Sequence, residues 1–136
     1  MARLAVYVLA LALGVTGGCG KEQVVEDCSQ NVDPDRRIRG CTQIIEREGA
    51  TPTYLAGAYE ARGLAYHKKR AYNRAIADFD KAIELNPDEV GYHISKGISY
   101  IEMRDRERAI AAFRMALEID PSNELAKKGL KLAEQN

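Results

Sequence analysis

Residues 59–87 read YEARGLAYHKKRAYNRAIADFDKAIELNP, and residues 93–121 read HISKGISYIEMRDRERAIAAFRMALEIDP. The two segments align without a gap, so every counterpart lies at the same distance further along the chain. The matched pairs are Gly63 and Gly97, Tyr66 and Tyr100, Ala75 and Ala109, Phe79 and Phe113, Ala82 and Ala116, and Pro87 and Pro121. An internal repeat of this kind predicts one helical unit that is used twice and stacked on itself.

Each copy contains two stretches of helical periodicity, joined at Arg70-Ala71 or Arg104-Asp105 and ended by Asn-Pro or Asp-Pro. The small residues of each copy let its two helices approach closely, and the Tyr and Phe side chains fill the space between them. Because a single helix pair cannot bury its apolar face, we expect neighbouring pairs to stack.

The order Gly-x-x-Tyr, Ala-x-x-x-Phe-x-x-Ala and Pro, present twice in phase, resembles the tetratricopeptide repeat. The spacing from Gly63 to Gly97 is also that of this repeat. The resemblance implies an all-α fold, a short right-handed α-solenoid of helix-turn-helix repeats. The chain departs from the repeat's usual Trp, where it has Tyr59 and His93, and from its usual Leu before the glycine, where it has Arg62 and Lys96.

The repeat pattern extends over residues 34–136: a half-repeat at 34–49, repeats at 56–89 and 90–123, and a cap helix at 124–136. Residues 34–46 can be laid on 72–84, which places Cys41 at the position of Phe79. Asp33-Pro34 and Thr51-Pro52 are good helix starts. The cap helix is expected to set Leu125, Leu130 and Leu132 against lysines on its polar face.

The N-terminal residues 1–18, MARLAVYVLALALGVTGG, have one early positive charge, a short apolar run and then small residues. This pattern is typical of a secretory signal peptide, and the run is shorter than the roughly twenty residues of a membrane-spanning helix. Residues 15–19 resemble the lipobox of bacterial lipoproteins, in which the cysteine, here Cys19, is diacylated. An uncleaved anchor, a buried helix and ordinary cleavage beside an unmodified Cys19 remain alternatives.

Residues 19–33 are interpreted as a tether that contains one partner of a disulfide bond. Export places the chain in an oxidising compartment, where Cys28 and Cys41 are expected to pair. That pairing leaves Cys19 over, as a lipid-bearing residue should be. The predicted location is therefore the bacterial cell envelope, facing the periplasm, with the membrane reached through a lipid anchor only.

The sequence contains no motif typical of a catalytic or cofactor-binding site. Twenty basic and twenty acidic residues balance, which argues against a nucleic-acid-binding protein. No phosphate-binding glycine loop, metalloprotease motif or nucleophile elbow is present, and neither a cofactor nor a metal is expected. Asp78 and Asp80 are interpreted as solvated surface. The chain is therefore expected not to be an enzyme, with a thiol-redox or metal activity as the least favoured reading.

The resemblance implies a concave face, lined by the first helix of each pair, that binds peptides or partner helices. Projected onto this sequence, the face contains eight residues: Glu60, Leu64, His67, Ile94, Ile98, Ile101, Lys128 and Leu132. Leu64, Ile98 and Leu132 are expected to form one apolar row, while packing between helices or cover by the N-terminal tail is the alternative. The carboxylate clamp of chaperone-binding relatives is not carried over, because Glu60, Leu64 and Ser95 stand at its positions.

These observations predict a non-catalytic, exported lipoprotein that binds a protein or peptide as a scaffold or assembly factor. The alternative is a self-associating protein that forms a homodimer through the same concave face.

Overall fold

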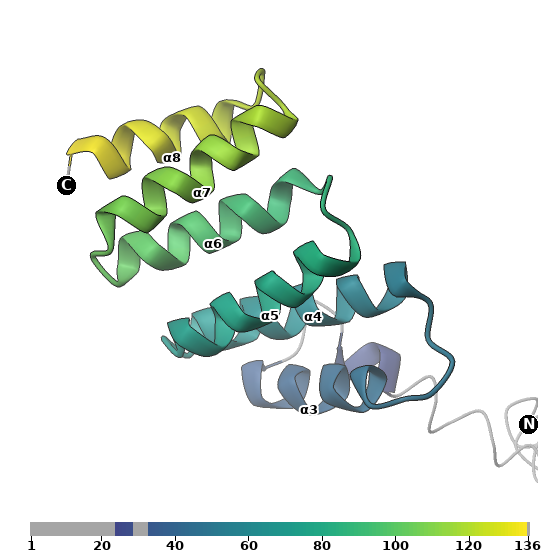
Figure 1. Cartoon of the computed structure of the whole chain (residues 1–136). Helices are drawn as coiled ribbons and strands as arrows, with labels where there is room; N and C mark the ends of the chain where they lie inside the picture. The colour runs from purple at the N-terminus through teal and green to yellow at the C-terminus, as the bar shows by residue number, and fades with distance from the viewer. Residues whose placement is uncertain (1–23, 29–32, 136) are drawn as a thin grey trace, which may run out of the picture.

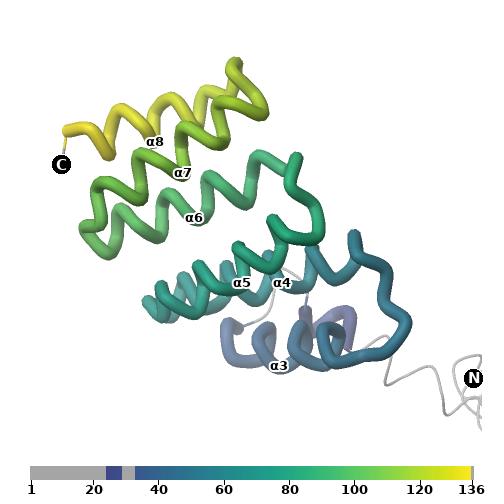
Figure 2. Tube along the Cα trace, viewed as in Figure 1, coloured from purple at the N-terminus to yellow at the C-terminus, as the bar shows by residue number. Residues whose placement is uncertain are grey.

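The computed structural model describes residues 24–28 and 33–135, and all regular structure in these residues is helical. Beyond one helical turn at residues 24–27, this part of the chain forms six helices: α3 (Pro34–Ile45), α4 (Pro52–Lys68), α5 (Tyr72–Leu85), α6 (Val90–Glu102), α7 (Arg106–Ile119) and α8 (Glu124–Gln135). Successive helices pack against each other in an open stack, from α3 at one end to α8 at the other (Figures 1 and 2). The expected all-α solenoid is confirmed.

The helix starts follow the predicted capping residues. The side chain of Asp33 accepts hydrogen bonds from the backbone N–H groups of Asp35 and Arg36, and Pro34 occupies the first turn. Thr51 accepts from the N–H of Tyr54 in the same way at the start of α4. These side chains satisfy N–H groups that have no partner within their own helix, so both helix starts are encoded locally.

The two helices of each pair are joined by turns with the same backbone geometry. Arg70 and Arg104 both have φ 59°, in the left-handed region that side chains other than glycine adopt uncommonly. In each turn this arginine donates its N–H to the third carbonyl before it, His67 or Ile101. Since the two arginines are counterparts in the aligned segments, the sequence repeat is also a structural repeat.

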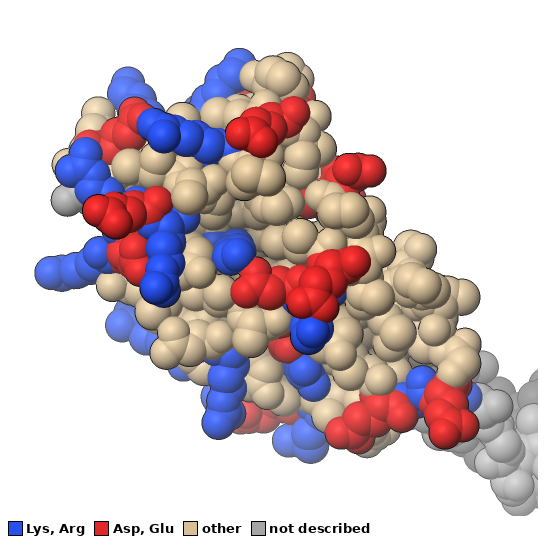
Figure 3. All heavy atoms as spheres, viewed as in Figure 1, with Lys and Arg blue, Asp and Glu red and all other residues tan. Residues whose placement is uncertain are grey.

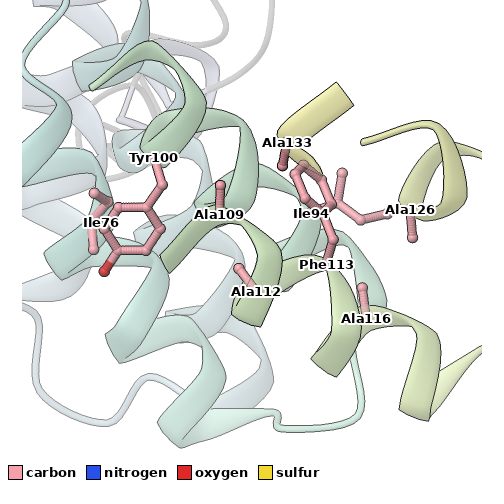
Figure 4. Close-up of a cluster of buried hydrophobic side chains, with 9 residues drawn as sticks. All are labelled: Ile76, Ile94, Tyr100, Ala109, Ala112, Phe113, Ala116, Ala126 and Ala133. Carbon is pink, nitrogen blue, oxygen red and sulfur yellow. The ribbon is translucent and has the colours of Figure 1, made fainter. Parts of the chain in front are cut away.

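The core is organised around the phenylalanine of each repeat. Phe79 and Phe113 are both fully buried, and Phe113 lies within a cluster that reaches from α5 to α8 (Figure 4). A Cβ atom on Gly63 would lie 2.7 Å from Cε1 of Phe79, and one on Gly97 would lie 2.8 Å from Cζ of Phe113. Only glycine therefore permits this helix spacing, because the aromatic ring occupies the place of a side chain.

The alanines of the repeat pattern are buried, as expected of residues that let helices approach closely. All four have no exposed surface: Ala75, Ala82, Ala109 and Ala116. The sequence predicted that Ala116 lets the two helices of its own pair approach closely. In the structure it also takes part in a second contact. It belongs to the cluster of Phe113 that also contains Ala126, so it lies at the contact of α7 with α8 as well.

The prolines of the repeat pattern lie outside the core. Pro87 and Pro121 are both exposed, in the turns that follow α5 and α7. These helices end before the prolines, at Leu85 and Ile119. Both prolines therefore follow the ends of these helices, where a proline prevents the helix from continuing.

The cap helix buries a different face from the one predicted. Ala126 and Ala133 are buried and Leu130 packs against the core, whereas Leu125 and Leu132 are 58% and 49% exposed. The reason is that the Phe113 ring also fills the space beside Gly129, so α8 approaches through its small residues. The prediction of a shared apolar side for the three leucines was wrong.

The interpretation of Asp78 as solvated surface was also wrong. Asp78 is 5% exposed, and its carboxylate accepts hydrogen bonds from Nε and Nη2 of Arg62, both at 2.8 Å. Nη1 of Arg62 donates to the hydroxyl of Thr42 at 3.0 Å, which links α3, α4 and α5. Asp80 faces the other way and pairs with Lys96 at 2.6 Å. The cations that replace the repeat's usual leucine are thus paired with the two aspartates of α5.

At the N-terminal end, residues 24–28 lie across α3. The structure joins Cys28 to Cys41, whose Cα atoms are 4.7 Å apart, and Asp27 pairs with Arg36 at 2.6 Å. A Cβ atom on Gly40 would lie 2.6 Å from Cβ of Asp27, so the segment packs directly on the helix backbone. Because Cys41 stands at the position that phenylalanine has in the later copies, the segment covers the side of α3 that a preceding helix would otherwise cover.

We expect Gly97→Ala to lower the free energy of unfolding by about 1–3 kcal/mol, because the added methyl group would overlap the buried Phe113 ring. Gly57→Ala is the matched control, since a Cβ atom there meets nothing within 4 Å. In this exposed helical position alanine should raise stability by up to about 1 kcal/mol. Urea unfolding followed by circular dichroism measures both changes, and equal effects would contradict this account of the core.

Candidate interaction surface

The first helices of the successive pairs, α4, α6 and α8, contact one another in turn and form one side of the stack. We call this side the inner face and define it by Leu64, Ile98 and Leu132; all eight residues predicted from the sequence lie on these three helices. Leu64, Ile98 and Leu132 occupy the same repeat position and are evenly spaced along the chain. Helices with the same orientation and register bring these three side chains to one level of the stack.

This apolar row is accessible to solvent. Ile98 is 37% exposed and Leu132 is 49% exposed, while Leu64 is half-buried. Isolated apolar side chains on a surface are ordinary, but a row across adjacent helices forms a continuous strip. Such a strip is suited to contact with the apolar side chains of another chain.

The isoleucine stripe of α6 is only partly on this surface. Ile94 is 6% exposed and belongs to the core cluster with Phe113, and Ile101 is half-buried against the same cluster. A helix turns by about 100° per residue, so positions i, i+4 and i+7 diverge in direction by tens of degrees. Ile94 is therefore a core residue, and the prediction that it lies on the partner-binding surface was wrong.

His67 joins two of the inner helices instead of facing open solvent. Its Nδ1 lies 3.0 Å from Oγ of Ser99, and its ring meets Tyr72 edge-on at 5.2 Å between centroids. Ser99 is fully buried, so the contact fixes α4 against α6. His67 thus has a packing role, and only its remaining exposed surface is accessible to a ligand.

Two charged residues complete the predicted face. Burial, together with the nearby carboxylate of Glu89, raises the pKa of Glu60 above its usual value. Lys128 on α8 is exposed. The inner face therefore has an acidic position on α4, a basic one on α8, and the apolar row beside them.

Sequence reasoning missed two residues beside the row. Arg37 and Lys68 line a hollow together with Leu64 and His67, where α3 meets the end of α4. Arg37 is 4% exposed, and in the alignment of the half-repeat it stands at the position of Ala75. An arginine in the place of a small residue was the available signal, since its long side chain has to extend to the edge of the helix pair.

Metal-ligating clusters and membrane-spanning helices are both absent from the described part of the chain. No three His, Cys, Asp or Glu side chains within residues 24–28 and 33–135 are grouped so that they could hold a metal ion. In the same residues, no helix combines the length and the apolar character needed to cross a bilayer. Cys19 and the predicted signal peptide lie outside the described residues.

Models of the tetratricopeptide repeat match residues 56–89 and residues 90–123, which together are half of the chain. The chain belongs to the tetratricopeptide repeat family. Members of this family are typically non-catalytic modules for protein–protein interaction. No curated protein matches the sequence.

Solved tetratricopeptide repeat domains have the same fold. The Arabidopsis OM64 domain is 24% identical with a TM-score of 0.72, covering 86% of this chain and 96% of that one. The TPR2B domain of yeast Sti1, in a complex with pHsp70, is 23% identical with a TM-score of 0.73, covering 85% and 96%. The second domain of human RPAP3, with the HSP70 peptide SGPTIEEVD, is 24% identical with a TM-score of 0.68, covering 76% and 82%.

We expect Glu60→Gln to raise the free energy of unfolding at neutral pH. The folded chain raises the pKa of Glu60, so the ionised carboxylate costs stability once the pH exceeds the ordinary value of about 4.3. The gain should disappear as the pH falls below that value, where the carboxyl group is neutral in both states. Urea titrations across pH 3.5–7 measure the difference in free energy of unfolding between the variant and the unchanged chain. A difference that does not change with pH would contradict the assignment to ionisation of Glu60.

Proposed function

We propose that this tetratricopeptide repeat protein is exported, is anchored in the bacterial cell envelope by a lipid on Cys19, and binds a protein partner through its inner face. It would act as a scaffold or assembly factor. The observation that carries the binding proposal is the accessible row of Leu64, Ile98 and Leu132 along three adjacent helices.

The chemistry of the face suggests the kind of partner. An extended segment or helix with apolar side chains would cover the row, and Lys128 at the α8 side offers a positive charge to an acidic residue. Solved domains of the same fold carry peptides, such as the HSP70 peptide with human RPAP3. The fold alone does not specify the ligand, so the proposal stops at a protein or peptide with an apolar contact surface.

The export proposal rests on residues 1–19 and on the number of cysteines, because pairing Cys28 with Cys41 leaves Cys19 over. Cys28 belongs to the short segment that lies across α3 and Cys41 belongs to α3 itself, so a disulfide between them closes a loop between the segment and the helix. A bond of this loop length contributes about 3 kcal/mol to stability. The end helix of a stack has a neighbour on one side only, so it benefits most from such a bond.

We expect Ile98→Glu to reduce crosslinked partner recovery from an envelope extract at least about tenfold, because it places a charge in the centre of the apolar row. Tyr54→Glu is the matched control, since Tyr54 is 44% exposed and lies in the first turn of α4, away from the row. Equal recovery with both variants would contradict binding through the inner face. Light scattering of the purified chain separates a homodimer, which Ile98→Glu would dissociate, from a different partner.

We expect the mature chain to begin at a diacylated Cys19 and to contain a Cys28–Cys41 bridge. Mass spectrometry of the intact protein and of its non-reduced peptides measures both. An unmodified N-terminus at another residue would exclude the lipoprotein, whereas free thiols at Cys28 and Cys41 would exclude only the bridge.

A further inference from the structure

A second hollow lies between α5 and α7, the helices that do not contribute to the inner face. Its volume is about 240 Å³, and α6 forms its floor. Asp80, Ile83, His93, Lys96, Arg108 and Met115 are among the residues that line it. On the face shown in Figure 3, uncharged surface is interspersed with residues of both charges. The hollow is smaller than the roughly 300 Å³ at which drug-sized pockets begin, so it suits a single ring.

Three residues that line the hollow differ in kind from their counterparts in the first repeat. His93, Ala112 and Met115 are the counterparts of Tyr59, Asp78 and Lys81 in the aligned repeats. In the first repeat, Arg62 lies against the Tyr59 ring and pairs with the buried Asp78. Ala112 offers no carboxylate, and Lys96 pairs instead with Asp80 at the rim. The space that the larger side chains occupy in the first repeat is therefore open in the second.

His93 provides a polar group at the bottom of the hollow. The residue is only 8% exposed, and no hydrogen bond joins its ring to another group within residues 24–28 and 33–135. Its ring nitrogens are not among the fully buried polar atoms that lack a partner, so they keep accessible surface. A neutral imidazole offers one donor and one acceptor, and a buried polar group gains from a ligand that satisfies it.

The walls favour an aromatic ligand. Met115 is 45% exposed, and its thioether sulfur can contact the edge of a ring. The guanidinium of Arg108 lies 5.9 Å from the centroid of Tyr100, and Lys96 also lines the hollow. Both cations already have partners, Tyr100 for Arg108 and Asp80 for Lys96, so they border the hollow and leave the contact with a ligand to the other lining residues. Ile83 adds apolar surface from α5.

We propose that this hollow binds one aromatic ring that carries a hydrogen-bonding group, a phenol or an indole, with His93 as the hydrogen-bond partner. The ring is either a free small molecule or the Tyr or Trp side chain of a partner. The site lies on a different side of the molecule from the inner face, so it neither requires nor replaces the function proposed above.

The test titrates the purified full-length chain with p-cresol, indole and toluene and follows backbone amide shifts by NMR. We expect saturable binding of p-cresol and indole with Kd on the order of 1 mM, with shifts in α5, α6 and α7. Toluene has the same ring without the hydroxyl group and should bind about three- to tenfold more weakly. Equal binding of toluene and p-cresol would overturn the role of His93, and no saturable binding would overturn the site.

Two variants locate the binding site. His93→Trp places the repeat's usual residue in the hollow and should abolish binding, whereas Tyr59→Trp, at the same position of the first repeat, should not. Met115→Lys introduces the residue of the first repeat and should weaken binding about fivefold or more, because it removes the thioether contact and adds charge. Met103→Lys is its control, since Met103 is 37% exposed and does not line the hollow.

Circular dichroism confirms that each variant is folded before titration. If His93→Trp or Met115→Lys binds p-cresol as the unchanged chain does, the hollow is not the site.

N-acetyl-tryptophanamide separates the two sources of the ring. Binding equal to that of indole supports a side chain of a partner, and binding of indole alone supports a free small aromatic ligand.

Discussion

The close approach of a glycine to a phenylalanine ring is the constraint on which the structure depends. Gly63 meets Phe79, and Gly97 meets Phe113, at distances that leave no room for a Cβ atom. The ring fixes the distance between the two helices of a pair, and Phe113 also fixes α8 through Gly129. Because each helix pair is rigid in this way, the residues of successive inner helices stay in register and the apolar row is continuous.

The N-terminal end meets the same need differently. The second helix of the half-repeat has no first helix before it within residues 24–28 and 33–135, and it places Cys41 where the later copies place phenylalanine. The segment that carries Cys28 lies against Gly40 and pairs with α3 through Asp27 and Arg36. This short segment thus covers the helix side that a full helix covers elsewhere. It also brings the proposed membrane tether to one end of the stack.

The differences between the two repeats are as informative as their matches. Arg62 and Lys96 both depart from the usual leucine, and each is paired with an aspartate of α5. In the first repeat, this network and Tyr59 occupy the space between the helices, whereas the second repeat has the hollow that His93 lines. The polar substitutions at this repeat position are therefore compensated by an aspartate in both copies, and the hollow of the second copy accompanies its His93, Ala112 and Met115.

The sequence by itself determined the helix-pair architecture, the caps at Asp33 and Thr51, and the apolar row, because these follow from local chemistry and from a fixed repeat period. Periodicity could not decide how far each helix is rotated about its axis. Only the tertiary structure decided that Ile94 enters the core, that Asp78 is buried beside Arg62, and that α8 packs mainly through its alanines. Burial depends on which neighbouring ring or guanidinium occupies the shared space, and that neighbour belongs to a different helix.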